Sequence, residues 1–240
     1  MQKLSIIIPA HNEENRIEQT LHAYLGFFND IKKQGKLETE IVVVLNGCAD
    51  NTERVVRTIQ KEWNNCILLN FKESGKGFAI KQGFLNALTR PSDIIGFVDA
   101  DMATSPQAFF ALFEHLHTAD GVIASRYRVD SIIQPPRPWI KRWGSRIFYE
   151  SLIILLFGIR YSDYQCGAKL FKRRVIEAVA PHLTVTQWAF DVELLFLCKK
   201  YGFHVIEAAT EWYDKAGSKL RISSGFRMLA NLVKLRFKHL

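Results

Sequence analysis

Short apolar runs alternate with segments of helical periodicity from Leu4 to Ser125. A continuous apolar run bounded by turn residues is typical of a buried strand, whereas apolar residues at helical spacing mark one face of a helix. We expect strands at residues 4–8, 40–45, 66–70, 93–98 and 121–125. Because helical segments separate these runs, the pattern predicts an α/β fold with a mostly parallel central sheet flanked by helices.

The pattern changes after Arg126. The proline-rich stretch 132–138 predicts a loop. Residues 147–159 are strongly apolar, but a helix needs about 20 apolar residues to span a bilayer, so this segment is too short. We expect a main domain at 1–215 and a basic amphipathic C-terminal segment at 216–240.

The C-terminal segment has two interpretations. Its helix can lie in a membrane interface, or it can pack on the domain and keep its basic face in solvent. The presence of a second apolar segment at 147–159 favours the membrane. The residues expected on its apolar face are Ile222, Phe226, Leu229, Val233 and Phe237.

The net charge of +8 indicates an anionic partner, such as nucleic acid, anionic lipid or a phosphorylated small molecule. The basic residues gather in 137–146 and after Lys215, and neither segment resembles a nucleic-acid-binding module, so we expect no nucleic acid. The four cysteines show no zinc spacing. No secretory leader is visible, and we expect a cytoplasmic protein in a reducing compartment.

Polar and glycine-rich motifs follow the expected strands. In a parallel sheet the loops after the strands share one edge, where ligands bind. Asp99 and Asp101 are hard oxygen ligands that can hold Mg²⁺ or Mn²⁺, and Lys76 supplies a point charge suited to phosphate. An isolated Asp-x-Asp is more often a solvated turn, but the four loops together predict a site for a nucleotide diphosphate with a divalent cation. The motifs are Pro9-Ala10-His11-Asn12-Glu13, Asn46-Gly47-Cys48-Ala49-Asp50, Gly75-Lys76-Gly77 and Asp99-Ala100-Asp101.

These four motifs and three later ones follow one another in the order typical of the family 2 glycosyltransferases. The chain resembles this family and, within it, the polyprenyl-phosphate and dolichyl-phosphate sugar synthases. The resemblance covers residues 4–215 and implies the GT-A fold, with 1–215 as the catalytic domain. The later motifs are Ala124-Ser125-Arg126-Tyr127, Asp163-Tyr164-Gln165-Cys166-Gly167-Ala168-Lys169 and Phe190-Asp191-Val192-Glu193.

The resemblance implies a role for each matching position. Donor-binding residues would be Pro9, Asn12, Glu13, Asn46, Lys76 and Asp99. Metal ligands would be Asp99 and Asp101. Acceptor-binding residues would be Arg126, Lys141, Arg142, Ser145, Asp163 and Gln165. Catalytic residues would be Asp99, Asp101, Arg126 and Asp191, with Glu193 beside Asp191 closing the site.

The implied reaction is a metal-dependent, inverting transfer of a hexose from a nucleotide sugar to polyprenyl phosphate at the cytoplasmic face of a membrane. A lipid phosphate is already ionised at neutral pH and needs cationic positioning, whereas a sugar hydroxyl would require Asp191 to take a proton. The motifs favour glucose and UDP, with mannose and GDP as the alternatives.

The sequence departs from the family pattern at two positions of the expected site. Asn46 stands where an Asp is common, which leaves the nucleotide open, and Ala168 replaces a usual Phe. A soluble or polysaccharide acceptor, and a non-catalytic nucleotide-sugar-binding module, are the competing functions.

Overall fold

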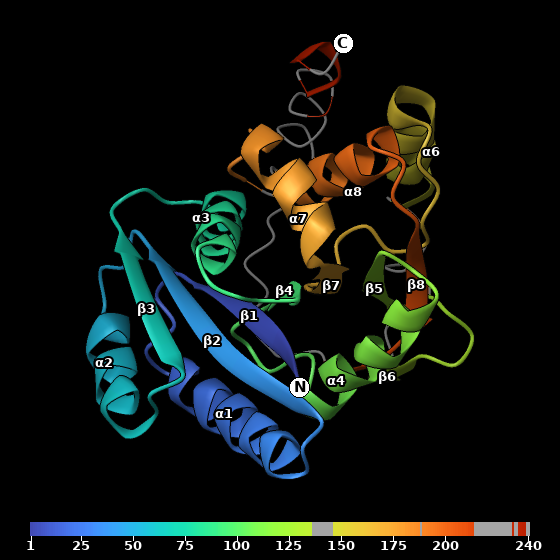
Figure 1. Ribbon diagram of the computed structural model, residues 1–240. Helices are drawn as coiled ribbons and strands as arrows, with labels where there is room; N and C mark the ends of the chain where they lie inside the picture. Colours follow the sequence, from blue (N-terminus) through green and yellow to red (C-terminus); the bar gives the residue numbers. More distant parts are fainter. Residues whose placement is uncertain (136–145, 188, 214–231, 233–234, 239–240) are drawn as a thin grey trace.

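A seven-stranded sheet forms the centre of the computed structural model (Figure 1). The structure describes residues 1–135, 146–187, 189–213, 232 and 235–238, and the side chains of 146–149 lie outside that description. The strand order is β3-β2-β1-β4-β7-β5-β8. These strands are β1 (Gln2–Ala10), β2 (Leu37–Asn46), β3 (Cys66–Phe71), β4 (Ile94–Val98), β5 (Gly121–Ser125), β7 (Ala168–Lys172) and β8 (Val205–Ala209). The first five correspond to the five predicted strands.

Helices cover both faces of the sheet, as the sequence predicted (Figure 1). Successive side chains of a strand point to opposite faces, so Ile6 and Ile8 join the core on one face while Ile7 joins the core on the other. The helices on the face of Ile6 are α1 (Ile17–Lys33), α2 (Thr52–Glu62) and α4 (Pro106–Glu114). Those on the face of Ile7 are α3 (Lys76–Leu88), α6 (Arg146–Phe157), α7 (Arg173–Val179) and α8 (Phe190–Lys200).

One strand of the sheet runs against the others. β7 pairs antiparallel with both β4 and β5, while the remaining strand pairs of this sheet are parallel. Ala168, the first residue of β7, lies opposite Val98, the last residue of β4. The loop that precedes β7 therefore reaches the edge at which the parallel strands end.

A second, two-stranded sheet corrects the loop predicted at 132–138. Residues Ile132–Gln134 form β6, which pairs with β9 (Glu211–Tyr213). The Ser131 hydroxyl joins this sheet to the end of β5, because it donates to the Ser125 carbonyl at 2.6 Å and accepts from Thr210 N at 3.2 Å. The partner strand is distant in sequence, and three residues are too few for a periodic pattern.

The apolar segment at 147–159 belongs largely to α6. Ile153 and Phe157 are buried in the core, whereas Leu155 is 81% exposed. Among the described residues, no helix combines the length and apolar character needed to cross a membrane.

Little of the segment 216–240 falls within the described residues. Leu232 and Leu235 are buried in the core on the α3 and α8 face, and Phe237 is 73% exposed. Ile222, Phe226, Leu229 and Val233, four of the five residues expected on the apolar face, lie outside the described residues. The expectation of a membrane-interface helix remains a prediction.

Candidate active site

Asp99 and Asp101 follow directly after β4, in a turn that is held from two sides. Asp99 N donates to the Gly167 carbonyl at 3.1 Å, and the Thr20 hydroxyl donates to the Ala100 carbonyl at 2.7 Å. The Asp101 carboxylate accepts from Ala103 N at 2.9 Å. These bonds fix the backbone of the turn and the Asp101 carboxylate at the carboxyl edge of the sheet, where the sequence predicted them.

Lys76, the first residue of α3, forms an ion pair with Asp99, with 2.5 Å between Nζ and Oδ1. Burial alone would lower the pKa of the Lys76 ammonium, but the negative charges of Asp99 and Asp191 raise it above its ordinary value. The lysine therefore stays charged beside the expected donor position. Gly75, which precedes it with φ of 139°, leaves no room for a side chain, because a Cβ there would lie 2.3 Å from the Thr186 carbonyl oxygen.

Asp99 is also enclosed by Gly167, the residue before β7. A Cβ at Gly167 would lie 1.9 Å from Oδ2 of Asp99. One carboxylate oxygen therefore faces Lys76, and the other packs against a backbone that only glycine can provide.

The two carboxylates differ in their surroundings, because one Asp99 oxygen is paired with Lys76. Burial and the charge of Asp99 raise the pKa of the Asp101 carboxyl, and a divalent cation would offset both effects. In the part of the chain that the structure describes, no group of three or more Asp, Glu, His or Cys residues could hold a metal ion. Mg²⁺ is commonly bound by one or two carboxylates together with substrate phosphates, so the residues present fit a cation that the donor helps to bind.

The loops after β1 and β2 are joined to each other at the expected nucleotide pocket. His11 Nδ1 donates to the Asn46 carbonyl at 2.7 Å, and Asn12, with φ of 54°, accepts from Ala49 N at 2.8 Å through its side chain. Pro9 lies within β1, paired with Val44 of β2. The structure thus brings three of the predicted donor-binding residues to one edge.

Glu13 and Asn46 differ in what their side chains contact. Glu13 forms an ion pair with Arg16 at 2.6 Å. Asn46 is 4% exposed, and its side-chain Oδ1 has no hydrogen-bond partner among the described residues. A buried carbonyl oxygen without a partner is costly, and an N–H group of a bound base would satisfy it.

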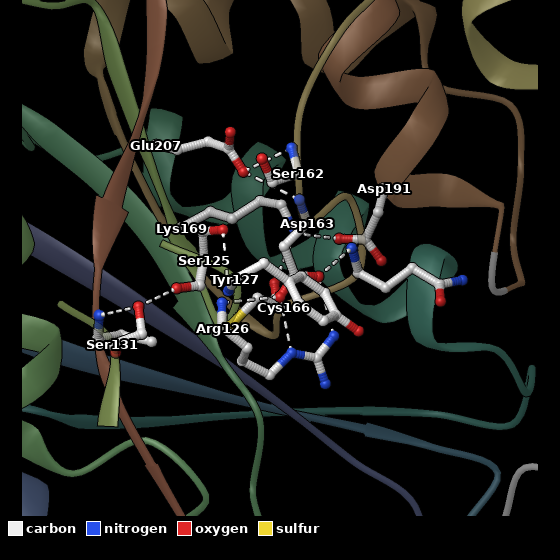
Figure 2. Close-up of polar contacts among 12 residues, drawn as sticks. Ser125, Arg126, Tyr127, Ser131, Ser162, Asp163, Cys166, Lys169, Asp191 and Glu207 are labelled. Atoms are coloured by element: carbon white, nitrogen blue, oxygen red, sulfur yellow. Dashed lines mark hydrogen bonds and ion pairs between the residues drawn. The ribbon is translucent and has the colours of Figure 1, made fainter. Parts of the chain in front are cut away.

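Arg126 follows directly after β5, and Asp163 holds it (Figure 2). Asp163 Oδ2 accepts from Arg126 Nε at 2.7 Å and from its backbone N at 3.0 Å, and Oδ1 accepts from Nη2 at 2.9 Å. The Arg126 guanidinium carbon also lies 5.3 Å from the ring centre of Trp212 in β9. Burial alone would raise the pKa of the Asp163 carboxyl, but the charge and hydrogen bonds of Arg126 lower it.

Asp191 lies in the first turn of α8 and is paired with Lys169 of β7 (Figure 2). The distance from Lys169 Nζ to Asp191 Oδ1 is 2.6 Å, and the same ammonium donates to the Cys166 carbonyl at 2.6 Å. Glu193 does not share this position. Its carboxylate accepts from Thr184 and Val185 N–H groups and orders the segment before α8.

The structure describes one of the other four predicted acceptor-binding residues. Gln165 N donates to Asp163 Oδ1 at 3.2 Å, so Gln165 belongs to the loop that fixes Arg126. Lys141, Arg142 and Ser145 lie outside the described residues, and their acceptor contacts remain predictions.

The glycosyl transferase family 2 profile matches residues 5–180 of this chain. The chain belongs to glycosyl transferase family 2. As the resemblance implied, the ligand edge carries a carboxylate pair, a lysine and an arginine. Family 2 membership makes this protein a glycosyltransferase.

Several curated family 2 relatives cover almost the whole chain. A dolichyl-phosphate beta-glucosyltransferase from Dictyostelium discoideum is 34% identical over an alignment of 251 positions, which covers 99% of this chain and 75% of the relative. The enzyme of the same name from Drosophila melanogaster is 33% identical and covers 91% of this chain and 69% of its own length. The human one is 28% identical and covers 100% of this chain and 76% of its own length.

The solved structures confirm the GT-A fold. Glucosyl-3-phosphoglycerate synthase from Mycobacterium tuberculosis, in complex with Mn²⁺, uridine diphosphate and phosphoglyceric acid, superposes with a TM-score of 0.69. It is 17% identical and covers 98% of this chain and 78% of its own. At this identity the likeness concerns the fold alone.

Sequence reasoning assigned no role to four residues of this family 2 site: Gly167, Lys169, Glu207 and Trp212. A lysine inside an otherwise apolar stretch, as in residues 168–171, was the available signal for Lys169, because such a residue needs a buried partner. Trp212 and Glu207 come close to the Arg126 loop through β8 and β9, which the apolar pattern did not reveal.

Proposed function

We propose that this protein transfers glucose from UDP-glucose to the phosphate of a polyprenyl phosphate such as dolichyl phosphate, with inversion at the sugar carbon. The observation that carries the proposal is the loop at 163–167. It holds Arg126 through Asp163 at one end and packs against Asp99 through Gly167 at the other. A cation for an acceptor phosphate and a carboxylate for the donor are thus fixed by a single short segment. The curated relatives support the choice of substrates.

On the donor side, Pro9, Asn12, Glu13 and Asn46 line the nucleotide pocket, and Lys76 with Asp99 meets the sugar diphosphate. Asp101, with Asp99 beside it, would hold Mg²⁺ or Mn²⁺. Such a cation would stabilise the negative charge that develops on the departing nucleotide diphosphate. Lys76 also stabilises the charge of the departing diphosphate, because its ammonium remains positive beside Asp99.

On the acceptor side, Arg126 contacts the lipid phosphate, together with Lys141, Arg142 and Ser145. A phosphate nucleophile needs no general base. The ion pair of Asp191 with Lys169 supports this view, because a proton transferred to Asp191 would break a buried pair. We assign to Asp191 the positioning of ligands at the site, as a fixed anion next to the charge of Lys76.

Two exposed apolar side chains follow Arg126 in the sequence, which suits an acceptor with a hydrocarbon chain. Val129 is 98% exposed and Ile132 is 49% exposed, and both lie between Arg126 and the end of β6. We propose that residues 1–215 form the catalytic domain and that 216–240 attach it to the cytoplasmic face of a membrane.

The test is turnover by the purified chain with UDP- or GDP-linked glucose and mannose, polyprenyl phosphate and Mn²⁺. We expect glycolipid from UDP-glucose, and we expect it to disappear in Asp101→Ala or with a chelator. Glycolipid formation that Asp101→Ala and chelation leave intact would contradict the metal site. Transfer to soluble sugars alone, or nucleotide-sugar binding without any transfer, would replace the proposal with one of the two competing functions.

A further inference from the structure

We propose that Glu207 of β8 is a positioning residue for the acceptor step: it fixes the backbone at Ser162 and Asp163, and through them the Arg126 guanidinium. The inference rests on the proposed function, because it takes the acceptor phosphate to be the ligand of Arg126. None of the residues of the strand-end motifs performs this task.

Glu207 holds two successive backbone N–H groups with one carboxylate oxygen. Oε1 accepts from Ser162 N at 2.8 Å and from Asp163 N at 2.9 Å (Figure 2). Glu207 itself is held by the sheet, since β8 pairs with β5 and places Glu207 opposite Ile123. A residue on a regular strand thus fixes a loop that is 44 residues away in the sequence.

Asp163 then transmits this position to Arg126. A carboxylate offers about four lone-pair sites, and Asp163 uses them on Arg126 N, Nε and Nη2 and on Gln165 N. With 3% of its surface exposed, Asp163 has no oxygen left for a substrate. We therefore assign Asp163, predicted as an acceptor-binding residue, to the positioning of Arg126.

Asp163 and two aromatic rings surround the Arg126 guanidinium, and the second ring is that of Tyr127, 6.0 Å from the guanidinium carbon. Nε and Nη2 face Asp163, and the Trp212 ring lies 5.3 Å from the guanidinium carbon. Arginine recognises phosphate through the fixed fork of its N–H groups, so a rotation of the guanidinium plane would misalign the remaining donors. A small displacement of the 162–163 backbone would have this effect.

The mechanism requires an acceptor oxygen at Glu207, not a negative charge. Glu207→Gln keeps a carbonyl oxygen that can accept the same two N–H groups, whereas Glu207→Leu removes it. The expected nucleotide pocket lies on β1, β2 and α3, away from these contacts, whereas Asp99 meets the loop at its other end, through Gly167. We therefore expect the change at Glu207 to affect the acceptor more than the donor.

The experiment measures initial rates of the intact chain with UDP-glucose and polyprenyl phosphate in detergent, each varied in turn. We expect Glu207→Leu to raise KM for polyprenyl phosphate by about tenfold to 100-fold, as for a displaced positioning group. KM for UDP-glucose should change by no more than about twofold, and Glu207→Gln should resemble the wild type. The matched control is Glu177→Leu, which removes an exposed carboxylate paired with Arg173, and it should leave both values unchanged.

A double-mutant cycle decides whether Glu207 acts through Arg126. In an Arg126→Lys background, Glu207→Leu should add little to the acceptor KM. If the leucine variant does not fold, Glu207→Asp, which shortens the reach by one methylene, gives the same comparison. Equal effects on both substrates, equal effects of Gln and Leu, or additive effects with Arg126→Lys would overturn the inference. Absence of wild-type transfer to polyprenyl phosphate would instead overturn the proposed function and, with it, this inference.

Discussion

Lys169 and Asp191 form an ion pair in the core of the protein, with 2.6 Å between Nζ and Oδ1 and side chains that are 0% and 4% exposed. The Lys169 ammonium also lies 5.1 Å from the ring centre of Phe97 in β4. The pair links β7 to α8 directly behind the ligand edge. Its two charges neutralise each other, and neither reaches bulk water.

Removal of Lys169 should therefore destabilise the protein. Lys169→Met leaves Asp191 buried without its cation, and we expect the free energy of unfolding to fall by about 3–5 kcal/mol. The double variant Lys169→Met/Asp191→Leu removes both charges and should recover most of that loss. Urea unfolding of the three proteins measures both effects, and a double variant less stable than Lys169→Met would contradict the assignment.

Gly167→Ala should reduce activity by displacing Asp99. The added Cβ would lie 1.9 Å from Oδ2 and 2.2 Å from Cγ of Asp99, so the carboxylate must leave its position beside Lys76. We expect kcat to fall by about 100-fold. Gly26→Ala is the matched control, because nothing lies within 4 Å of a Cβ at that position in α1. It should keep full activity and gain about 0.5–1 kcal/mol of stability. Wild-type kcat in Gly167→Ala would refute the role given to this glycine.

The Asp163–Arg126 pair should make stability depend on pH in the acid range. The pKa of the Asp163 carboxyl is lowered in the folded protein, so its stabilisation is present above its ordinary pKa of about 4 and is lost as the pH falls through the lowered value. Asp163→Asn should cost about 3 kcal/mol at pH 7, and the difference from wild type should shrink below about pH 4.

Thermal unfolding across pH measures this dependence. Asp30→Asn provides the control, since Asp30 and Lys33 form an ion pair with both side chains more than half exposed, at 66% and 68%. Asp30→Asn should change the unfolding temperature only slightly at every pH. A difference between Asp163→Asn and wild type that persists unchanged at pH 2 would show that the charge of Asp163 is not what stabilises Arg126.

Asn46→Leu should stabilise the free protein and weaken nucleotide binding. The buried Oδ1 without a partner costs about 1–3 kcal/mol, and an apolar side chain of similar shape removes that cost. The matched control is Thr39→Val, because the Thr39 hydroxyl, in the same strand, is also buried and finds no hydrogen-bond partner in the described part of the chain. Both variants should melt at higher temperature without ligand, but only Asn46→Leu should lose the stabilisation by UDP. Unchanged UDP stabilisation in Asn46→Leu would exclude Asn46 from the base pocket.

The sequence predicted the parts of the fold that local patterns determine. Continuous apolar runs identified β1 to β5, and the rule that ligands bind at the carboxyl edge brought Asn46, Lys76 and Asp99 together. The sequence did not predict β7, because Lys169 interrupts its apolar pattern. The residue that neutralises this buried lysine is Asp191, which lies in α8. Asp163 and Glu193 were predicted to meet ligands, but their carboxylates bind N–H groups within the protein. Backbone partners of this kind have no sequence signature, so the roles of such acids required the structure.

The reversed direction of β7 also has a consequence for how such enzymes diversify. In the described sheet, β4 and β5 make no hydrogen bonds to each other, because β7 lies between them. In the function we propose, the nucleotide lies at the ends of β1 to β4, whereas Arg126, Glu207 and Trp212 come from β5, β8 and β9. Substitutions in these three strands can therefore accumulate with less effect on the nucleotide pocket than substitutions in the loop at 163–167, which contacts Asp99. A lineage can change the molecule that it glycosylates and inherit its sugar donor unchanged.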